Sequence, residues 1–115
     1  MAWNPTEAET FLKDAAHLQH TRAVKKITGF VFSSGRELVL AKENESKVTI
    51  YVNAAPEHMP DVIVEKVYEP TSERKGRHAD IESVAQSLGY SFRAIRLHVK
   101  SRAGLDLLLN WLRYA

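Results

Sequence analysis

The sequence predicts an α+β fold: one sheet of about five strands with helices on one face, in the order α-β-β-β-β-α-β-α. Segments with the i, i+3, i+4 apolar spacing of helices stand at both ends of the chain. Between them lie short β-branched runs, separated by clusters of Gly, Pro, Asn and Ser that are typical of turns. The length of 115 residues suits one ordinary domain, so a single domain is expected over residues 1–115.

The first helix is expected from Pro5 to about Gln19. In the stretch NPTE, Asn4 is a favourable N-cap, Pro5 fits the first helical position, and Glu7 holds the capping-box position. The apolar stripe that follows consists of Phe11, Leu12, Ala15 and Ala16, with Leu18 as a further candidate member.

Four strands are expected next. The stretch KITGFVFSSGRELVLA contains two apolar runs around a short loop in which Gly35 supplies a positive φ, as in a hairpin. KVTIYV, which follows a second turn, alternates Val48, Ile50 and Val52 with polar or aromatic residues. After NAAPEHMP, whose prolines cannot continue a strand, DVIVEKVY is the fourth strand.

The C-terminal third predicts a helix, a strand and a second helix. The helix is expected from about Ala79 to Leu88, with Gly89 at its C-terminal end, and the strand from about Phe92 to Lys100. Ser101 is placed to cap the last helix. The leucines with the spacing of a buried stripe in this helix are Leu105, Leu108, Leu109 and Leu112.

Strand alternation in the stretch FRAIRLHVK predicts a row of basic side chains. If the helices cover the face of Ile95, Leu97 and Val99, the opposite face carries Arg96, His98 and Lys100 at intervals of about 7 Å. Such a row is a candidate site for phosphate groups. The alternative is that these residues serve solubility or pair with an acid on a neighbouring strand, such as Glu65.

The loop SERKGRH is the second candidate for binding phosphate. Its basic residues are Arg74, Lys75, Arg77 and His78. If this loop and the row lie on one side of the sheet, they form a phosphate-binding surface; otherwise the loop is a solvated turn.

Tyr51 and Tyr68 are candidates to stack on a displaced base. The alternative is that tyrosines at the ends of elements, such as Tyr68, pack there with their hydroxyls in water.

Composition excludes several classes of protein. Hydrophobic residues make up 44% and charged residues 26%, close to the averages for globular proteins, and the formal net charge is +2. Eleven of the 16 Lys and Arg residues nevertheless fall in three runs without an acid, which favours local positive potential. The absence of cysteine excludes disulfides and thiolate metal sites, and with no signal peptide or membrane span evident, a cytoplasmic location is expected.

No catalytic signature is convincing, and neither a metal nor a cofactor is expected. His17 and His20 have the i, i+3 spacing of two ligands on a helix, but a third ligand is missing from the pattern. Glu45-x-Lys47 and Pro60-Asp61 resemble the two halves of a magnesium-dependent nuclease signature in the wrong order. Glycine-rich phosphate loops and nucleophile elbows are absent from the sequence. We therefore expect a chain that is not itself an enzyme.

The C-terminal half resembles the N-terminal DNA-reading domains that precede HNH-type nucleases in modification-dependent restriction systems. The similar features are Tyr68 at the end of a strand, GRHADIE from Gly76, LHVKS from Leu97, and LDLLLNWL from Leu105. The resemblance covers about 50 residues and includes no HNH catalytic segment. The resemblance implies that this chain recognises DNA and does not cleave it. The more specific expectation is that the recognised DNA carries a modified base.

Two hypotheses of function follow. The first is a non-catalytic module that binds double-stranded DNA, as part of or partner to a larger nuclease. The alternative is a small protein–protein interaction subunit or homodimer with no role in nucleic-acid binding, which uses an open sheet face or an edge strand. Trp3 and Trp111 would then belong either to its interface or to the core.

Overall fold

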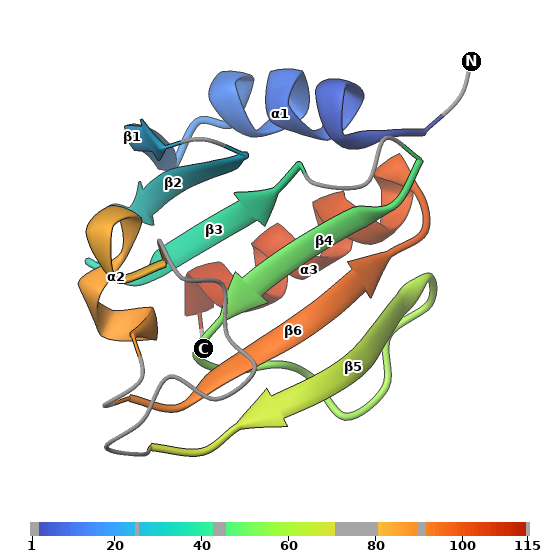
Figure 1. Cartoon of the computed structure of the whole chain (residues 1–115). Helices are drawn as coiled ribbons and strands as arrows, with labels where there is room; N and C mark the ends of the chain where they lie inside the picture. The colour runs from blue at the N-terminus through green and yellow to red at the C-terminus, as the bar shows by residue number, and fades with distance from the viewer. Residues whose placement is uncertain (1–2, 25, 43–45, 71–80, 90–91, 115) are drawn as a thin grey trace.

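A computed structural model describes residues 3–24, 26–42, 46–70, 81–89 and 92–114 and confirms the α+β class (Figure 1). Six antiparallel strands form one sheet in the spatial order β1-β2-β3-β4-β6-β5. The elements in chain order are α1 (Pro5–Asp14), β1 (Leu18–Val24), β2 (Ile27–Phe32), β3 (Glu37–Ala41), β4 (Val48–Val52), β5 (Val62–Tyr68), α2 (Ile81–Val84), η1 (Gln86–Leu88), β6 (Ala94–Val99) and α3 (Arg102–Tyr114). Among the described residues, no helix is long and apolar enough to cross a membrane.

Helix α1 starts where predicted and ends earlier. The Asn4 side chain accepts a 2.9 Å hydrogen bond from the Glu7 amide, and Pro5 occupies the first turn. The helix ends at Asp14, however, and Leu18–Val24 forms β1 against β2. The prediction of a helix to Gln19, and hence of five strands, was therefore wrong. Pairing with β2 gives the main chain of these residues hydrogen-bond partners and buries Leu18. The free energy gained in this way exceeds the local preference for helix.

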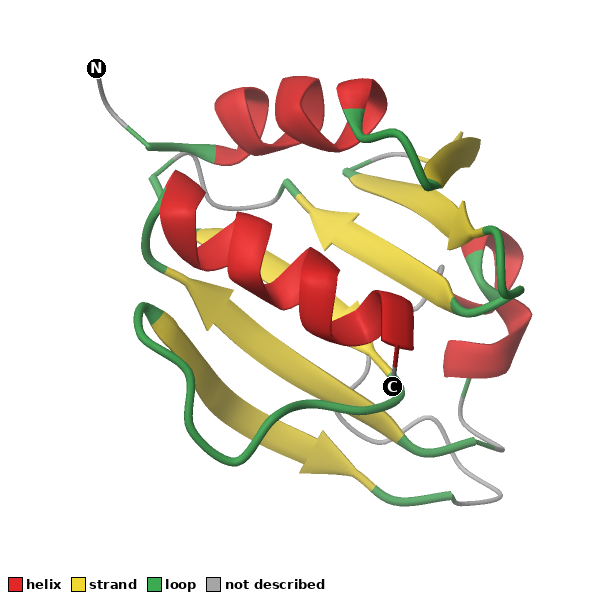
Figure 2. Ribbon diagram, turned by 180° about the vertical axis from the view of Figure 1, so that it is seen from behind, coloured by secondary structure: helices red, strands yellow, loops and turns green. Residues whose placement is uncertain are grey.

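The two long helices, α1 and α3, cover one face of the sheet (Figure 2). The leucine stripe of α3 is buried there as predicted, and Ile95, Leu97 and Val99 of β6 face it. Ser101 caps α3, because its hydroxyl oxygen accepts a 3.0 Å hydrogen bond from the Gly104 amide. This face holds the larger hydrophobic core, to which Trp3 and Trp111 add partly buried rings.

The second face is also covered in part, so the prediction of helices on one face alone was wrong. Helix α2 and η1 replace the single helix expected from Ala79 to Leu88, of which Ala79 lies outside the described residues. Their apolar side chains form a smaller cluster with residues of the second face. Val84 packs directly over Gly29 of β2: a β-carbon at Gly29 would lie 2.3 Å from Val84 Cγ1. Only glycine admits this close approach of α2 to the sheet.

Among the described residues, Gly35 and Asp61 have a backbone conformation in the left-handed region. Gly35 has φ of 94° in the hairpin between β2 and β3, as predicted. Asp61 has φ of 61° at the start of β5, which is tolerated by aspartate better than by most residues. The Asp61 carbonyl accepts a 2.7 Å hydrogen bond from the Lys100 amide, and its carboxylate accepts a 2.7 Å bond from Ser101. These bonds join the start of β5 to the junction between β6 and α3.

Candidate nucleic-acid interface

The second face of the sheet continues beyond α2 onto strands β4, β6 and β5 (Figure 1). Strand register brings polar side chains of the three strands into rows. Tyr51 and Lys66 are the cross-strand partners of Arg96, and Thr49 and Ile63 are those of His98. We call this region the basic face. Its charged and histidine side chains are Lys47, Glu65, Lys66, Arg96, His98 and Lys100.

Arg96 lies at the centre of the basic face and is held by its neighbours. Its Nη1 donates a 3.1 Å hydrogen bond to the Tyr68 hydroxyl, and its Nε lies 3.5 Å from Glu65 Oε1. Burial opposes the charge on the guanidinium, but Tyr68, Tyr51 and Glu65 outweigh this effect and raise the pKa of Arg96 above its ordinary value. The side chain remains 35% exposed, so a fixed cation is presented at the surface.

Glu65 is the acid that the sequence offered as a partner for Arg96, and the structure confirms that pairing. Its carboxylate also forms an ion pair with Lys47. A register shift between Val64 and Lys66 marks a bulge at Glu65, which places Glu65 and Lys66 on the same face. Among the described residues, the basic face therefore carries four Lys and Arg side chains and one carboxylate, which is only 19% exposed.

Tyr51 and Tyr68, the two tyrosines expected to stack on a displaced base, are buried in this structure, and the stacking role stays a prediction. They are 6% and 4% exposed, and their ring centroids lie 6.4 Å apart. Lys66 Nζ lies 5.0 Å from the centroid of the Tyr68 ring, so a cation occupies the approach to this aromatic surface. In this structure the tyrosines position Arg96 rather than present ring faces to a base.

The remaining predicted site residues fall into two groups. His98 is half-buried on β6, and Lys100 is exposed just beyond the end of that strand, so the predicted row of Arg96, His98 and Lys100 follows the expected parity. The loop residues lie outside the described part of the chain: they are Arg74, Lys75, Arg77 and His78.

Two members of the basic face, Lys47 and Lys66, were missed in the sequence. Lys47 precedes Val48 and has the parity of Tyr51, so strand alternation alone would have found it. Lys66 could not be found in this way, because the bulge at Glu65 reverses the parity of the second half of β5.

Metal-binding and nuclease motifs do not assemble in the described parts of the chain. No group of three His, Asp or Glu side chains there could hold a metal ion. His17 follows α1 and His20 lies in β1, where its ring contacts Phe30 at a centroid distance of 5.5 Å. Lys47 is paired with Glu65, and Asp61 is bonded to Ser101, while Glu45 lies outside the described residues.

Comparison with protein-family models, with curated proteins and with solved structures finds no match to this chain. The basic face must therefore be interpreted from its own chemistry.

Proposed function

We propose that this protein binds double-stranded DNA through the basic face. The observation that supports the proposal is the gathering of Lys47, Lys66, Arg96 and Lys100 in or beside three adjacent strands, where the described residues include one carboxylate, 19% exposed. Lysine and arginine at this density favour phosphate contacts, which supply most of the affinity of nucleic-acid-binding proteins.

The members of the basic face differ in the contacts we propose for them. Lys66 and Lys100 are exposed and can move to meet phosphates, whereas Arg96 is fixed by its tyrosine and glutamate neighbours. A guanidinium that is already held in place loses little conformational freedom when its remaining donors contact a phosphate.

The proposal includes the loop residues Arg74, Lys75, Arg77 and His78 on the strength of their sequence alone, because they lie outside the described residues. Along the chain this loop joins Tyr68 to α2, and both of these lie on the second face of the sheet. Selectivity for a modified base is a finer proposal, which rests on the resemblance of the C-terminal half to DNA-reading domains of restriction systems. In that proposal the chain reads DNA and does not cut it.

Fluorescence anisotropy of labelled duplexes, plain and cytosine-modified, tests the proposal. Binding is expected to weaken steeply between two salt concentrations, because each phosphate contact releases condensed counterions. Lys66→Gln and Lys100→Gln should each reduce the slope of log affinity against log salt by about 0.9. Lys13→Gln is the matched control, because Lys13 is an exposed residue on α1, on the other face. Absence of binding at low salt, or equal loss in the control, would refute the proposal.

A second candidate function, self-association or capture of a partner protein, is favoured by strand β5. It lies at the edge of the sheet, and three of its apolar side chains are well exposed: Ile63 at 44%, Val64 at 45% and Val67 at 39%. Size-exclusion chromatography with light scattering separates the candidates. A stable dimer that lacks affinity for DNA and dissociates in Val67→Lys would favour this second function.

A further inference from the structure

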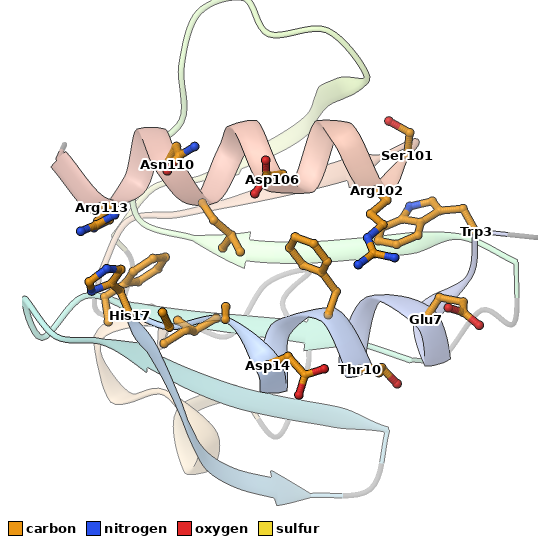
Figure 3. A pocket seen from close by; sticks show the side chains of 16 residues that line it. Trp3, Glu7, Thr10, Asp14, His17, Ser101, Arg102, Asp106, Asn110 and Arg113 are labelled. Carbon is orange, nitrogen blue, oxygen red and sulfur yellow. The ribbon is translucent and has the colours of Figure 1, made fainter.

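The face of the sheet opposite the basic face carries a cleft between α1 and α3 (Figure 3). Its volume is about 680 Å³, within the range of small-ligand sites. The two helices lie on the same side of the sheet, and the cleft opens between them. Its apolar surface is formed by Trp3, Phe11, Leu18, Phe32 and Leu109. Trp3 is fixed as part of the wall, because its indole N–H donates a 2.9 Å hydrogen bond to the Val99 carbonyl.

Arg102, which has no anionic partner among the described residues, lies over this apolar surface. The guanidinium carbon of Arg102 is 5.1 Å from the centroid of the Phe11 ring, and in Figure 3 the guanidinium lies between the two helices. In the described parts of the chain, Arg102 makes no ion pair or hydrogen bond with a carboxylate. Its planar donors are therefore free to bind a carboxylate in two-point fashion.

Acidic side chains also border the cleft, but they are placed differently. Glu7, Asp14 and Asp106 are all exposed. Figure 3 shows Asp14, together with Thr10, on the side of α1 that faces away from α3. Arg102 instead crosses the cleft above Phe11. Arg102, whose guanidinium lies over the Phe11 ring, is therefore a charged group that a ligand on the apolar surface would contact.

We propose that the cleft between α1 and α3 binds a small hydrophobic carboxylate. Its apolar body would lie on the ring and leucine surfaces, and its carboxylate would accept hydrogen bonds from Arg102 at the Trp3 and Phe11 end. Apolar contact supplies most of the affinity in a site of this kind, and the single charged group fixes the orientation of the ligand. The site is separate from the basic face and does not depend on the proposed function.

Isothermal titration calorimetry with three probes tests the proposal. Decanoate and 2-naphthoate offer a carboxylate on a chain and on a flat ring system, and decyltrimethylammonium offers the opposite charge on the same chain as decanoate. At least one carboxylate is expected to bind one molecule per chain with a dissociation constant below about 1 mM. The ammonium probe is expected to bind at least tenfold more weakly.

Variants identify the residue that holds the carboxylate. Arg102→Gln should weaken carboxylate binding about tenfold, the equivalent of about 1.4 kcal/mol. Lys13→Gln removes the same charge from α1 at a residue that does not line the cleft, so it should leave binding unchanged. Circular dichroism checks that the variants are folded. Failure of both carboxylates to bind, equal binding of the ammonium probe, or loss of binding in Arg113→Gln but not in Arg102→Gln would overturn the proposal.

Discussion

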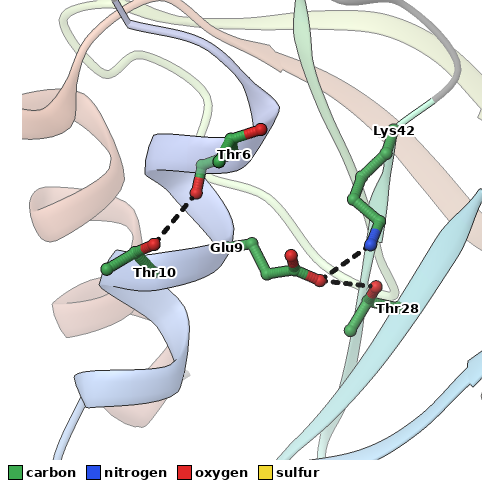
Figure 4. A network of polar contacts seen from close by, with 5 residues as sticks. All are labelled: Thr6, Glu9, Thr10, Thr28 and Lys42. Atoms are coloured by element: carbon green, nitrogen blue, oxygen red, sulfur yellow. Dashed lines mark hydrogen bonds and ion pairs between the residues drawn. The ribbon is translucent and has the colours of Figure 1, made fainter.

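Replacing Glu9 by glutamine is expected to destabilise this protein at neutral pH and to have little effect at acidic pH. Glu9 lies on α1 and reaches the sheet, where its Oε2 accepts a 3.0 Å hydrogen bond from the Thr28 hydroxyl and a 2.8 Å bond from Lys42 Nζ (Figure 4). Thr28 is completely buried, so its hydroxyl depends on a partner within the protein. A nearby hydrogen bond, from the Thr10 hydroxyl to the Thr6 carbonyl, lies within the helix.

The expected loss in the free energy of unfolding at pH 7 is about 1 kcal/mol. Hydrogen bonds to charged groups contribute roughly 1.5–3 kcal/mol, and glutamine keeps a neutral acceptor for Thr28. The side chains of Glu9 and Lys42 are 21% and 29% exposed, which places the ion pair between fully exposed pairs and buried ones. A loss of about 1 kcal/mol corresponds to a fall of roughly 4 °C in the melting temperature.

The dependence on pH follows from the pKa of Glu9. Burial opposes ionisation, but the hydrogen bonds from Lys42 and Thr28 and the charges of Lys42 and Lys13 outweigh it, so the pKa of Glu9 is lowered from its ordinary value of 4.5. A carboxyl with a lowered pKa in the folded state stabilises the protein above the unfolded pKa. This contribution is lost as the pH falls through the folded pKa. The difference between Glu9→Gln and the parent should therefore be constant above pH 4.5 and shrink below it.

Urea unfolding followed by tryptophan fluorescence, at a series of pH values on both sides of the ordinary carboxyl pKa, measures this difference. Glu57→Gln is the control, because Glu57 is exposed and its side chain has no ion-pair partner among the described residues. The control should differ little from the parent at every pH. A loss in Glu9→Gln that stays the same at acidic and neutral pH would refute the electrostatic argument.

The remaining predictions concern packing and capping. Gly29→Ala should destabilise the protein by about 1–3 kcal/mol in chemical denaturation, because the new methyl group overlaps Val84 and, less severely, the Thr21 hydroxyl. Val84→Ala in the same chain removes the larger overlap and should restore part of the loss. If Val84→Ala only adds to the loss, the contact between α2 and β2 is not as described. Ser101→Ala should cost about 1 kcal/mol in the same assay, since it removes the acceptor for the Gly104 amide and the donor to Asp61. Ser101→Asp keeps the acceptor but sets a second carboxylate against Asp61, and unchanged stability in it would contradict the pairing seen here.

The parts of the fold that are governed by local chemistry were predictable from sequence. The caps at Asn4 and Ser101 and the positive φ of Gly35 each follow from the preferences of one residue type. The burial of Ile95, Leu97 and Val99, with Arg96 and His98 on the other face, follows from strand alternation.

The parts governed by pairing between distant segments were not predictable. The apolar residues after Asp14 have helical spacing, but Leu18–Val24 pairs with β2. Nothing in the local sequence indicates that pairing. The exposure of Lys66 depends on the bulge in β5. The burial of Tyr68 depends on α2, which lies at a distance from that strand in the sequence. The cleft was missed for a similar reason, because it exists only where α1 and α3 lie side by side.

The position of β6 has a consequence for the order of folding. Among the described residues, β6 is the last strand in sequence, yet it lies between β4 and β5 and is the one strand of the sheet that pairs with β5. On a ribosome, β5 would therefore emerge and wait unpaired, with its exposed valines, until residues 94–99 had been synthesised. Long-range pairing of this kind slows folding and leaves strand edges open to wrong partners. Completion of the sheet therefore depends on the synthesis of one six-residue strand that follows all the others it joins.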